Sequence, residues 1–169
     1  MTKYKLWVLP LEAGRKPVPF LRTQFEEPDG RFSPDGRWVA YVTNESGHYD
    51  VYVRPFSPDA LGQGISSVGG KWLISENGGS SPMWRQDGKE LYYIDLEGKL
   101  MEVSLTAGSE FKASVSKALF QALPRVSGAA ILGQWAPSPD GKRFLFLVPE
   151  AQDTPPFTVV LNWQAGLKK

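Results

Sequence analysis

The chain has 169 residues, of which 41% are hydrophobic and 22% charged; this composition is typical of one globular unit and excludes a disordered chain. Nineteen lysine and arginine residues against eighteen aspartate and glutamate residues give a net charge of +1, and the basic residues are scattered, so neither nucleic acid nor a membrane surface is expected as a partner. Cysteine is absent, which excludes disulfides and thiolate metal sites and leaves the compartment undecided, and no stretch reaches the ~20 apolar residues of a membrane-spanning helix.

The first predicted strand covers residues 4–11, and the residues before it show no apolar signal region. The second covers residues 17–22. Its two prolines lack the N–H that a sheet ladder needs, which restricts it to the edge of a sheet. Seventeen glycines and fourteen prolines in the whole chain are typical of many short strands joined by turns.

The segment 31–41, Arg-Phe-Ser-Pro-Asp-Gly-Arg-Trp-Val-Ala-Tyr, predicts two strands joined by a tight turn. Pro34 fixes φ near the value that the second position of a turn needs, and Asp35 can accept bonds from nearby backbone N–H groups. Gly36 takes a positive φ without steric cost. The apolar run over residues 39–42 then predicts a strand that is covered on both faces.

This pattern recurs twice, at residues 84–94 and 137–147, and the turn aspartates are 52 and then 53 residues apart. Repetition at a fixed period indicates supersecondary units, which must stack because each is too small to bury its own apolar faces. The residues expected to have a structural role in the three turns are Pro34, Asp35, Gly36, Asp87, Gly88, Pro139, Asp140 and Gly141.

Further strands are predicted after the repeats, as third strands at 49–56, 99–105 and 157–163 and as outer fourth strands at 71–75 and 116–121. Residues 114–123 also carry a helical pattern, but their place in the repeat favours a strand. The expected organisation is a single unit over residues 1–169. It consists of a partial sheet (4–22), two four-stranded sheets (31–75 and 82–121) and a three-stranded partial sheet (134–163).

Several motifs occur in a fixed order along the chain: RFSPDGRWVAYVTNESG at 31–47, DVYVRPF at 50–56, GKWLIS at 70–75 and TVVLNWQAGLKK at 158–169. Over nearly the whole chain they resemble the WD-like repeats of TolB-type β-propellers, and in particular the C-terminal propeller of some bacterial serine/threonine protein kinases. The resemblance implies an all-β fold of four-stranded antiparallel propeller blades, about three per chain. It also implies a bacterial protein, and an extracytoplasmic one if it follows the kinase-linked family.

Loops on one face of such a propeller are the expected place for a ligand. His48 and Tyr49 fall on one of these loops. Trp84 and Arg85 are the other two candidates for the ligand face. In the other repeats the position of Trp84 holds Phe or Pro and that of Arg85 holds Ser, and Arg85 is expected to face the central channel. The Ser-Pro-Asp-Gly turns are expected on the opposite face, with a structural role and no part in ligand binding.

No catalytic motif is complete. His48 is the single histidine and lies near Ser46 and Asp50, but neighbours on one loop rarely reach the geometry of a Ser-His-Asp triad, and no Gly-x-Ser-x-Gly elbow exists. The segment 62–64, Gly-Gln-Gly, lacks the third glycine of a dinucleotide loop, and the His-Arg-Asp and Asp-Phe-Gly motifs of kinases are absent. We therefore expect no enzymatic activity and no cofactor.

The carboxylate clusters at 26–29 and at Asp95 and Glu97 lack the spacing of a calcium loop, so solvated turns are expected there, without a metal ion. The six Trp, six Tyr and nine Phe residues could stack on nucleic acid or sugar. Their repeat positions favour rings that fill the spaces between sheets.

Three functions fit these observations. The first is a non-catalytic binding or scaffolding module, the sensory or protein-interaction part of a larger bacterial signalling protein. The second is an accessory propeller of a prolyl-oligopeptidase-like hydrolase, and the third is a fragment made to study propeller assembly. Residues 164–169 resemble a natural C-terminus, which favours the first because such hydrolases continue into an enzyme domain.

The expected partner is a protein or peptide. We also expect self-association, because the incomplete ends could be completed by exchange between two chains. Such an exchange would give a closed symmetric dimer of roughly six blades.

Overall fold

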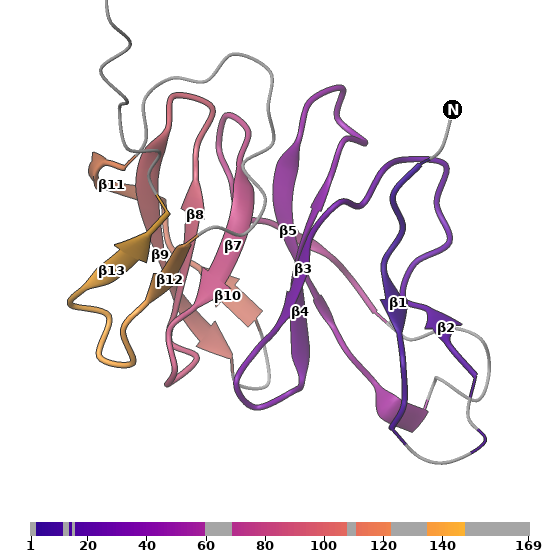
Figure 1. Cartoon of the computed structure of the whole chain (residues 1–169). Coiled ribbons are helices and arrows are strands. Elements are labelled where there is room, and N and C mark those ends of the chain that lie inside the picture. The colour runs from indigo at the N-terminus through magenta and orange to yellow at the C-terminus, as the bar shows by residue number, and fades with distance from the viewer. Residues whose placement is uncertain are drawn as a thin grey trace, which may run out of the picture.

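The computed structural model describes residues 3–11, 14, 16–59, 69–107, 111–122 and 135–147. This part of the chain forms thirteen strands in four small antiparallel sheets, one of them four-stranded, and the all-β fold expected from the sequence is confirmed. Figure 1 shows the sheets side by side in chain order, with the first and the fourth at opposite ends. Among the described residues, no helix is long and apolar enough to span a membrane.

The strands are named in chain order. The first sheet pairs β1 (Trp7–Val8) with β2 (Val18–Pro19). The second sheet contains β3 (Gly30–Phe32), β4 (Trp38–Thr43), β5 (Asp50–Pro55) and β6 (Trp72–Leu73). The third contains β7 (Ser80–Trp84), β8 (Glu90–Ile94), β9 (Lys99–Ala107), β10 (Phe111–Ala113) and β11 (Lys117–Gln121). The fourth pairs β12 (Trp135–Pro137) with β13 (Phe144–Phe146).

The third sheet contains a strand that the sequence pattern did not predict. β9 is nine residues long, and its outer edge is shared by the predicted strand β11 and by the additional strand β10. β10 forms because Phe111 is buried between the rings of Trp38 and Trp72, with centroid separations of 4.8 Å to each. The strand predicted at 157–163 lies outside the described residues.

Three turns of the same geometry join the first strand to the second in the second, third and fourth sheets. Gly36 has a φ of 70°, as predicted, and the glycines at 88 and 141 have φ values of 71° and 69°. Each of these glycines donates its N–H to the carbonyl three residues earlier at 2.9 Å; the acceptors are Ser33, Arg85 and Ser138. Each turn aspartate accepts the N–H two residues later at 3.0 or 3.1 Å; the donors are Arg37, Lys89 and Lys142.

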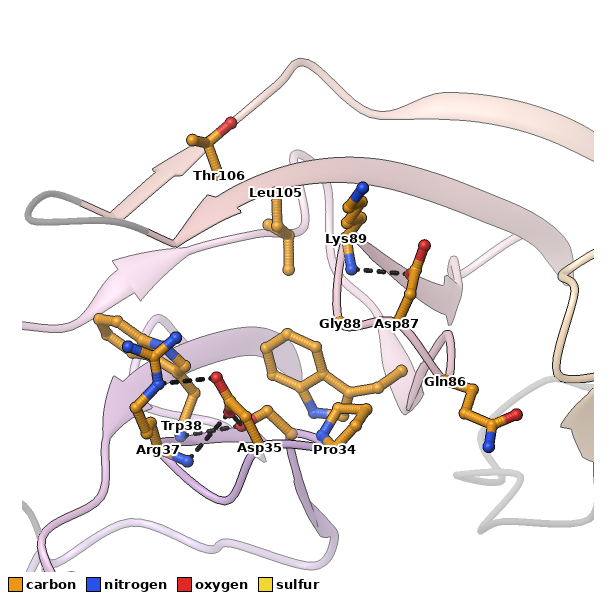
Figure 2. Close-up of a pocket in the computed structure, with 12 residues that line it drawn as sticks. Pro34, Asp35, Arg37, Trp38, Gln86, Asp87, Gly88, Lys89, Leu105 and Thr106 are labelled. Carbon is orange, nitrogen blue, oxygen red and sulfur yellow. Dashed lines mark hydrogen bonds and ion pairs between the residues drawn. The ribbon is translucent and has the colours of Figure 1, made fainter.

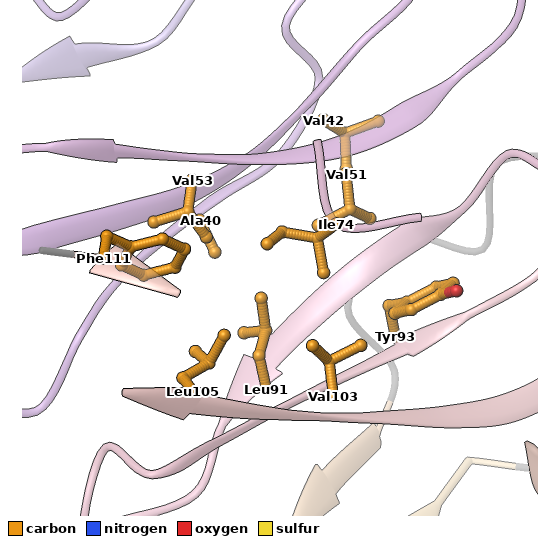
Figure 3. Close-up of a cluster of buried hydrophobic side chains, with 10 residues drawn as sticks. All are labelled: Ala40, Val42, Val51, Val53, Ile74, Leu91, Tyr93, Val103, Leu105 and Phe111. Carbon is orange, nitrogen blue, oxygen red and sulfur yellow. The ribbon is translucent and has the colours of Figure 1, made fainter. Parts of the chain in front are cut away.

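Apolar side chains fill the junctions between neighbouring sheets. The largest cluster lies between the second and third sheets, as Figure 3 shows, and its members are Ala40, Val42, Val51, Val53, Ile74, Leu91, Tyr93, Val103, Leu105 and Phe111. Because β4 and β5 alternate their side chains between two covered faces, Val39, Tyr41 and Tyr52 pack toward the first sheet instead. A third cluster, Tyr92, Ile94, Leu100 and Trp135, joins the third sheet to the fourth.

Candidate functional site

A cavity of about 610 Å³ lies between the first two turns and is called the turn groove here. The β3–β4 turn forms one wall and the β7–β8 turn the other, and Figure 2 shows Leu105 and Thr106 of β9 on one side of the space. Its lining residues are Ser33, Pro34, Asp35, Arg37, Trp38, Trp84, Gln86, Asp87, Gly88, Lys89, Leu105 and Thr106.

Two tryptophans in the turn groove depart from the pattern of the repeat. Trp38 stands where the other two copies have Glu90 and Arg143, and Trp84 stands where they have Phe32 and Pro137. The sequence singles out Trp84 but not Trp38. The sequence does contain an indication of Trp38, because an aromatic residue stands there at a position where the other two copies have a charged residue.

Neighbouring elements fix both tryptophans. The indole N–H of Trp84 donates to the carbonyl of Arg31 at 3.1 Å, which ties β7 to β3 across the junction. The ring of Trp38 packs edge-on against Trp72 with 5.6 Å between centroids, and its indole N–H has no hydrogen-bond partner among the described residues. The turn groove therefore presents aromatic surface that loses little side-chain freedom when a ligand binds.

The charges along the walls of the turn groove neutralise one another. Arg37 Nε lies 2.7 Å from Asp35, and Arg85 NH2 lies 2.7 Å from Asp87. The hydrogen bond from Arg85, with that from the Lys89 N–H, lowers the pKa of Asp87 to about 2. Burial alone would raise the pKa of Asp35, but hydrogen bonds from Ser33 and Arg37 lower it. Both aspartates are therefore ionised and paired at neutral pH, and among the charged groups that line the groove Lys89 has no ion-pair partner within the described residues.

Arg85 replaces the serine that the first and third turns use. In those turns the serine hydroxyl donates to the aspartate, at 2.6 Å from Ser33 and 2.5 Å from Ser138. The guanidinium of Arg85 makes the corresponding bonds to Asp87 and also reaches Glu90 at 2.5 Å. Its side chain is partly buried and lies beside Gly141 of the fourth sheet. The expectation that Arg85 faces a central channel stays a prediction.

His48 and Tyr49 lie at the opposite end of the second sheet, on the β4–β5 loop. The Tyr49 hydroxyl donates to Glu26 at 2.7 Å, and this hydrogen bond raises the pKa of Tyr49. The exposed His48 ring places Nε2 3.3 Å from Asp50 Oδ2. The four ligand candidates of the sequence therefore form two separate pairs, and the turn groove includes only Trp84.

Ser46, His48 and Asp50 come together without forming a catalytic relay. Ser46 Oγ donates directly to Asp50 Oδ2 at 2.6 Å, and His48 contacts the same oxygen. A triad needs the imidazole between the hydroxyl and the carboxylate, whereas here the carboxylate lies between the other two groups. Asp50 also accepts the Ser75 hydroxyl at 2.7 Å, so this cluster fixes the loop to β5 and the segment after β6.

The carboxylates at 26–29 are not all solvated, which corrects the sequence expectation. Glu27 is buried and binds Lys5 Nζ at 3.0 Å; Asp29 is buried beside Arg31 NH1 at 2.5 Å. Burial raises the pKa of Asp29 despite that arginine. Lys5 lies more than twenty residues before Glu27, so the local pattern could not reveal this ion pair.

Asp95 behaves as expected of a turn residue, since its Oδ1 accepts the N–H groups of Glu97 and Lys99 at 2.8 Å each. No group of three or more acidic or histidine side chains within the described residues is placed to hold a metal ion. The glycine segment at 62–64 lies outside the described residues.

No protein-family model matches the sequence, and no curated protein matches it. Among solved structures, the chain is similar to TolB from Acinetobacter baumannii, a β-propeller-containing protein seen in a crystal structure. The two are 17% identical, with a TM-score of 0.36. The likeness covers 80% of this chain, which spans 41% of the length of that TolB chain.

Proposed function

We propose that this chain is a non-catalytic binding module, a partial β-propeller whose turn groove holds an extended, uncharged segment of a partner protein. This proposal departs from the sequence expectation, which gave the turns a structural role alone and put the ligand on the opposite face. One observation carries the proposal: the two tryptophans that depart from the repeat, Trp38 and Trp84, line the same cavity. Both rings also pack against the apolar cluster between the second and third sheets, so the junction holds them in place at the wall of the cavity.

The chemistry of the turn groove favours a peptide with proline or aromatic residues. Indole faces accept proline rings and other aromatic rings, which is how several domains bind extended proline-rich peptides. Gln86 and Thr106 add an amide and a hydroxyl at the exposed margin, where a peptide backbone could exchange hydrogen bonds with them. A ligand with many charges is disfavoured because the two wall aspartates and Arg37 are already paired, and Lys89 is the single wall charge among the described residues left to meet one.

A binding role without catalysis agrees with the rest of the described chain. The Asp50 cluster lacks the order of groups that nucleophilic catalysis needs, and it ties a loop to its sheet instead. We expect assays with generic ester, peptide and phosphate substrates to match buffer. A turnover signal that is lost in His48→Ala would contradict this expectation.

The motifs that resemble kinase-linked propellers support a place in a larger bacterial signalling protein, as its sensory or protein-interaction part. An accessory role beside a hydrolase domain is the alternative. The coding sequence on either side of this segment distinguishes the two: kinase motifs before it support the first role, and a serine hydrolase domain after it supports the second.

The binding test uses short synthetic peptides in two sets, one uncharged and rich in proline and aromatic residues and one of equal length rich in charged residues. Calorimetry should detect members of the first set with Kd values below about 1 mM. Thr106→Arg, which fills the exposed margin of the turn groove, should weaken that binding at least tenfold. His48→Ala, at the other end of the sheet, is the matched control and should leave it unchanged.

Both variants should keep the thermal midpoint of the parent protein, because both side chains are exposed. Loss of binding in His48→Ala with retention in Thr106→Arg would place the ligand at the loops and overturn the assignment to the turn groove. Preference for the charged peptides would overturn the chemistry proposed for the ligand.

A further inference from the structure

The first and fourth sheets are complementary halves of the four-stranded second sheet. In the fourth sheet, Trp135, Ala136 and Pro137 pair with Phe146, Leu145 and Phe144. When Gly141 is aligned with Gly36, these pairs match the pairs between β3 and β4. There, Gly30, Arg31 and Phe32 pair with Tyr41, Ala40 and Val39. The fourth sheet thus reproduces the first two strands of the second sheet, pair by pair.

The first sheet reproduces the other two strands. Alignment of Pro10 with Pro55 places Trp7 on Tyr52 and Val8 on Val53. With this alignment, β1 pairs with β2 in the same register as β5 pairs with β6. In the first sheet Trp7 lies opposite Pro19 and Val8 opposite Val18. In the second sheet Tyr52 lies opposite Leu73 and Val53 opposite Trp72. In the second sheet the two halves are joined by six residue pairs between β4 and β5, from Trp38–Pro55 to Thr43–Asp50.

The corresponding edges of β13 and β1 carry no strand among the described residues. An open strand edge exposes backbone N–H and C=O groups and invites another strand. β1 and β13 of one chain lie at opposite ends of the molecule with two sheets between them, as Figure 1 shows, so they cannot pair with each other within that chain.

Side-chain exposure marks the same two edges. Leu145 is 75% exposed where its counterpart Ala40 is fully buried, and Leu147 is 64% exposed where Val42 is 1% exposed. Trp7 is 59% exposed where Tyr52 is 8% exposed. Large apolar side chains therefore occupy positions that a neighbouring sheet covers in the case of the second sheet, and the sheets of a second chain would cover them in a closed ring.

We propose that β1 of one copy of this chain pairs antiparallel with β13 of a second copy, so that β12, β13, β1 and β2 form a four-stranded sheet shared between two chains. The register of the second sheet predicts that Val8 lies opposite Leu145 and Trp7 opposite Phe146. The latter pair would reproduce the stacked rings of Tyr41 and Tyr52, whose centroids are 5.9 Å apart. Reciprocal pairing at both ends gives a closed two-fold dimer.

The surface involved is separate from the turn groove, so this inference does not rest on the proposed function. Its competitor is the chain's own segment 157–163, which the sequence predicts as a strand for the same edge of β13. Only β1 brings a fourth strand with it, because β2 is already paired to its other edge.

Cysteine cross-linking tests the register directly, since the chain contains no cysteine. Directly opposed residues of paired strands have Cα atoms about 4.5–5.5 Å apart, within the range of a disulfide. The two single variants Val8→Cys and Leu145→Cys are mixed and oxidised, and we expect a covalent species of twice the 18.8 kDa chain mass that contains one chain of each kind. Leu96→Cys mixed with Leu145→Cys is the control. Leu96 is 62% exposed, and so more accessible than Val8, but it lies on the β8–β9 turn, and this mixture should give at least tenfold less of the covalent species.

Light scattering coupled to size exclusion should show a dimer for the parent chain at micromolar concentration and a monomer for Leu145→Lys, which puts a charge into the shared sheet. A monomeric parent chain would overturn the proposal. A Leu145→Cys/Val160→Cys variant that forms an internal disulfide in a monomer would overturn it too, because the chain's own strand would then occupy the edge.

Discussion

The third sheet has two junctions, and they are built from different chemistry. The junction with the second sheet is apolar on both sides, with Leu91 and Val103 facing Val53 and its neighbours. The junction with the fourth sheet is half apolar, around Ile94 and Leu100, and half ionised. The first junction is therefore held mainly by burial, with the neutral hydrogen bond from the Trp84 indole to the Arg31 carbonyl across it. The second junction also contains titratable groups, so its stability depends on protonation.

The ionised half surrounds Glu90. This carboxylate accepts Arg85 NH1 at 2.5 Å and the Tyr92 hydroxyl at 2.8 Å. Glu102 lies opposite Tyr92 in the β8–β9 register, where burial raises its pKa and the nearby Glu90 raises it further. Lys117 and Arg85 both act to lower the pKa of Glu102, but burial and the neighbouring Glu90 outweigh them, so this carboxyl retains its proton to higher pH.

The largest expected effect is at the apolar junction. Leu91→Ala removes a fully buried side chain from the centre of the cluster between the second and third sheets, and it should lower the free energy of unfolding by about 3 kcal/mol. Urea denaturation followed by tryptophan fluorescence measures the loss. A loss of unfolding free energy below about 1 kcal/mol would mean that neighbouring side chains can move to fill the space left by Leu91, and that the packing of this junction is not rigid.

Substitutions at two turn glycines test the contacts of the fourth sheet, because the two glycines have the same backbone conformation. Gly36 and Gly141 have φ values of 70° and 69°, so an alanine is strained equally at both, by about 1 kcal/mol. An alanine Cβ at position 36 would meet no atom of the described residues within 4 Å, but at position 141 it would lie 2.5 Å from Tyr92 Oη and 2.8 Å from Arg85 Cδ. Gly141→Ala should therefore cost more than Gly36→Ala, by about 1–2 kcal/mol.

Thermal unfolding of the two glycine variants in parallel measures that difference. Equal losses would show that the fourth-sheet turn can move away from Arg85 and Tyr92 at no cost. The contacts seen at that junction would then contribute nothing to stability.

The sequence predicts the repeated turns and most strands because their signals are local. The Pro34–Gly36 turn needs only neighbouring residues, and it forms as expected. β10 was missed because it depends on Phe111 packing between Trp38 and Trp72, and these rings are far apart in the sequence. No periodicity within residues 111–113 could have indicated that contact.

The candidate site was predicted only in part for a related reason. Trp84 was visible as a departure from the repeat, but its proximity to Trp38 follows from the stacking of two sheets. His48 and Trp84 were grouped as one ligand face, although the structure puts them at opposite ends of their sheets. A repeat alignment shows which residue is unusual and leaves open which end of the sheet it occupies.

The smallest expected effect concerns protonation at the junction with the fourth sheet. The pKa of Glu102 in the folded protein is raised above the ordinary value of 4.5, so the folded state binds more protons than the unfolded state between these two values. Its contribution to stability is present below about pH 4.5 and is lost as the pH rises through the raised pKa. Asp87 acts in the opposite direction, since its lowered pKa gives a contribution that is lost as the pH falls from 3.8 toward about 2.

Glu102→Gln isolates the first of these two effects, because it keeps the shape of the side chain and removes its titration. The free energy of unfolding, measured by urea at a series of pH values from 4 to 7, should fall less steeply with rising pH in this variant than in the parent. Leu91→Ala is the control from the apolar junction: its values should be lower throughout and parallel to those of the parent. If Leu91→Ala also flattened the pH dependence, the pKa of Glu102 in the folded protein would depend on packing at the apolar junction. The two junctions would then be coupled, and the contrast between them would describe their contacts but not independent contributions to stability.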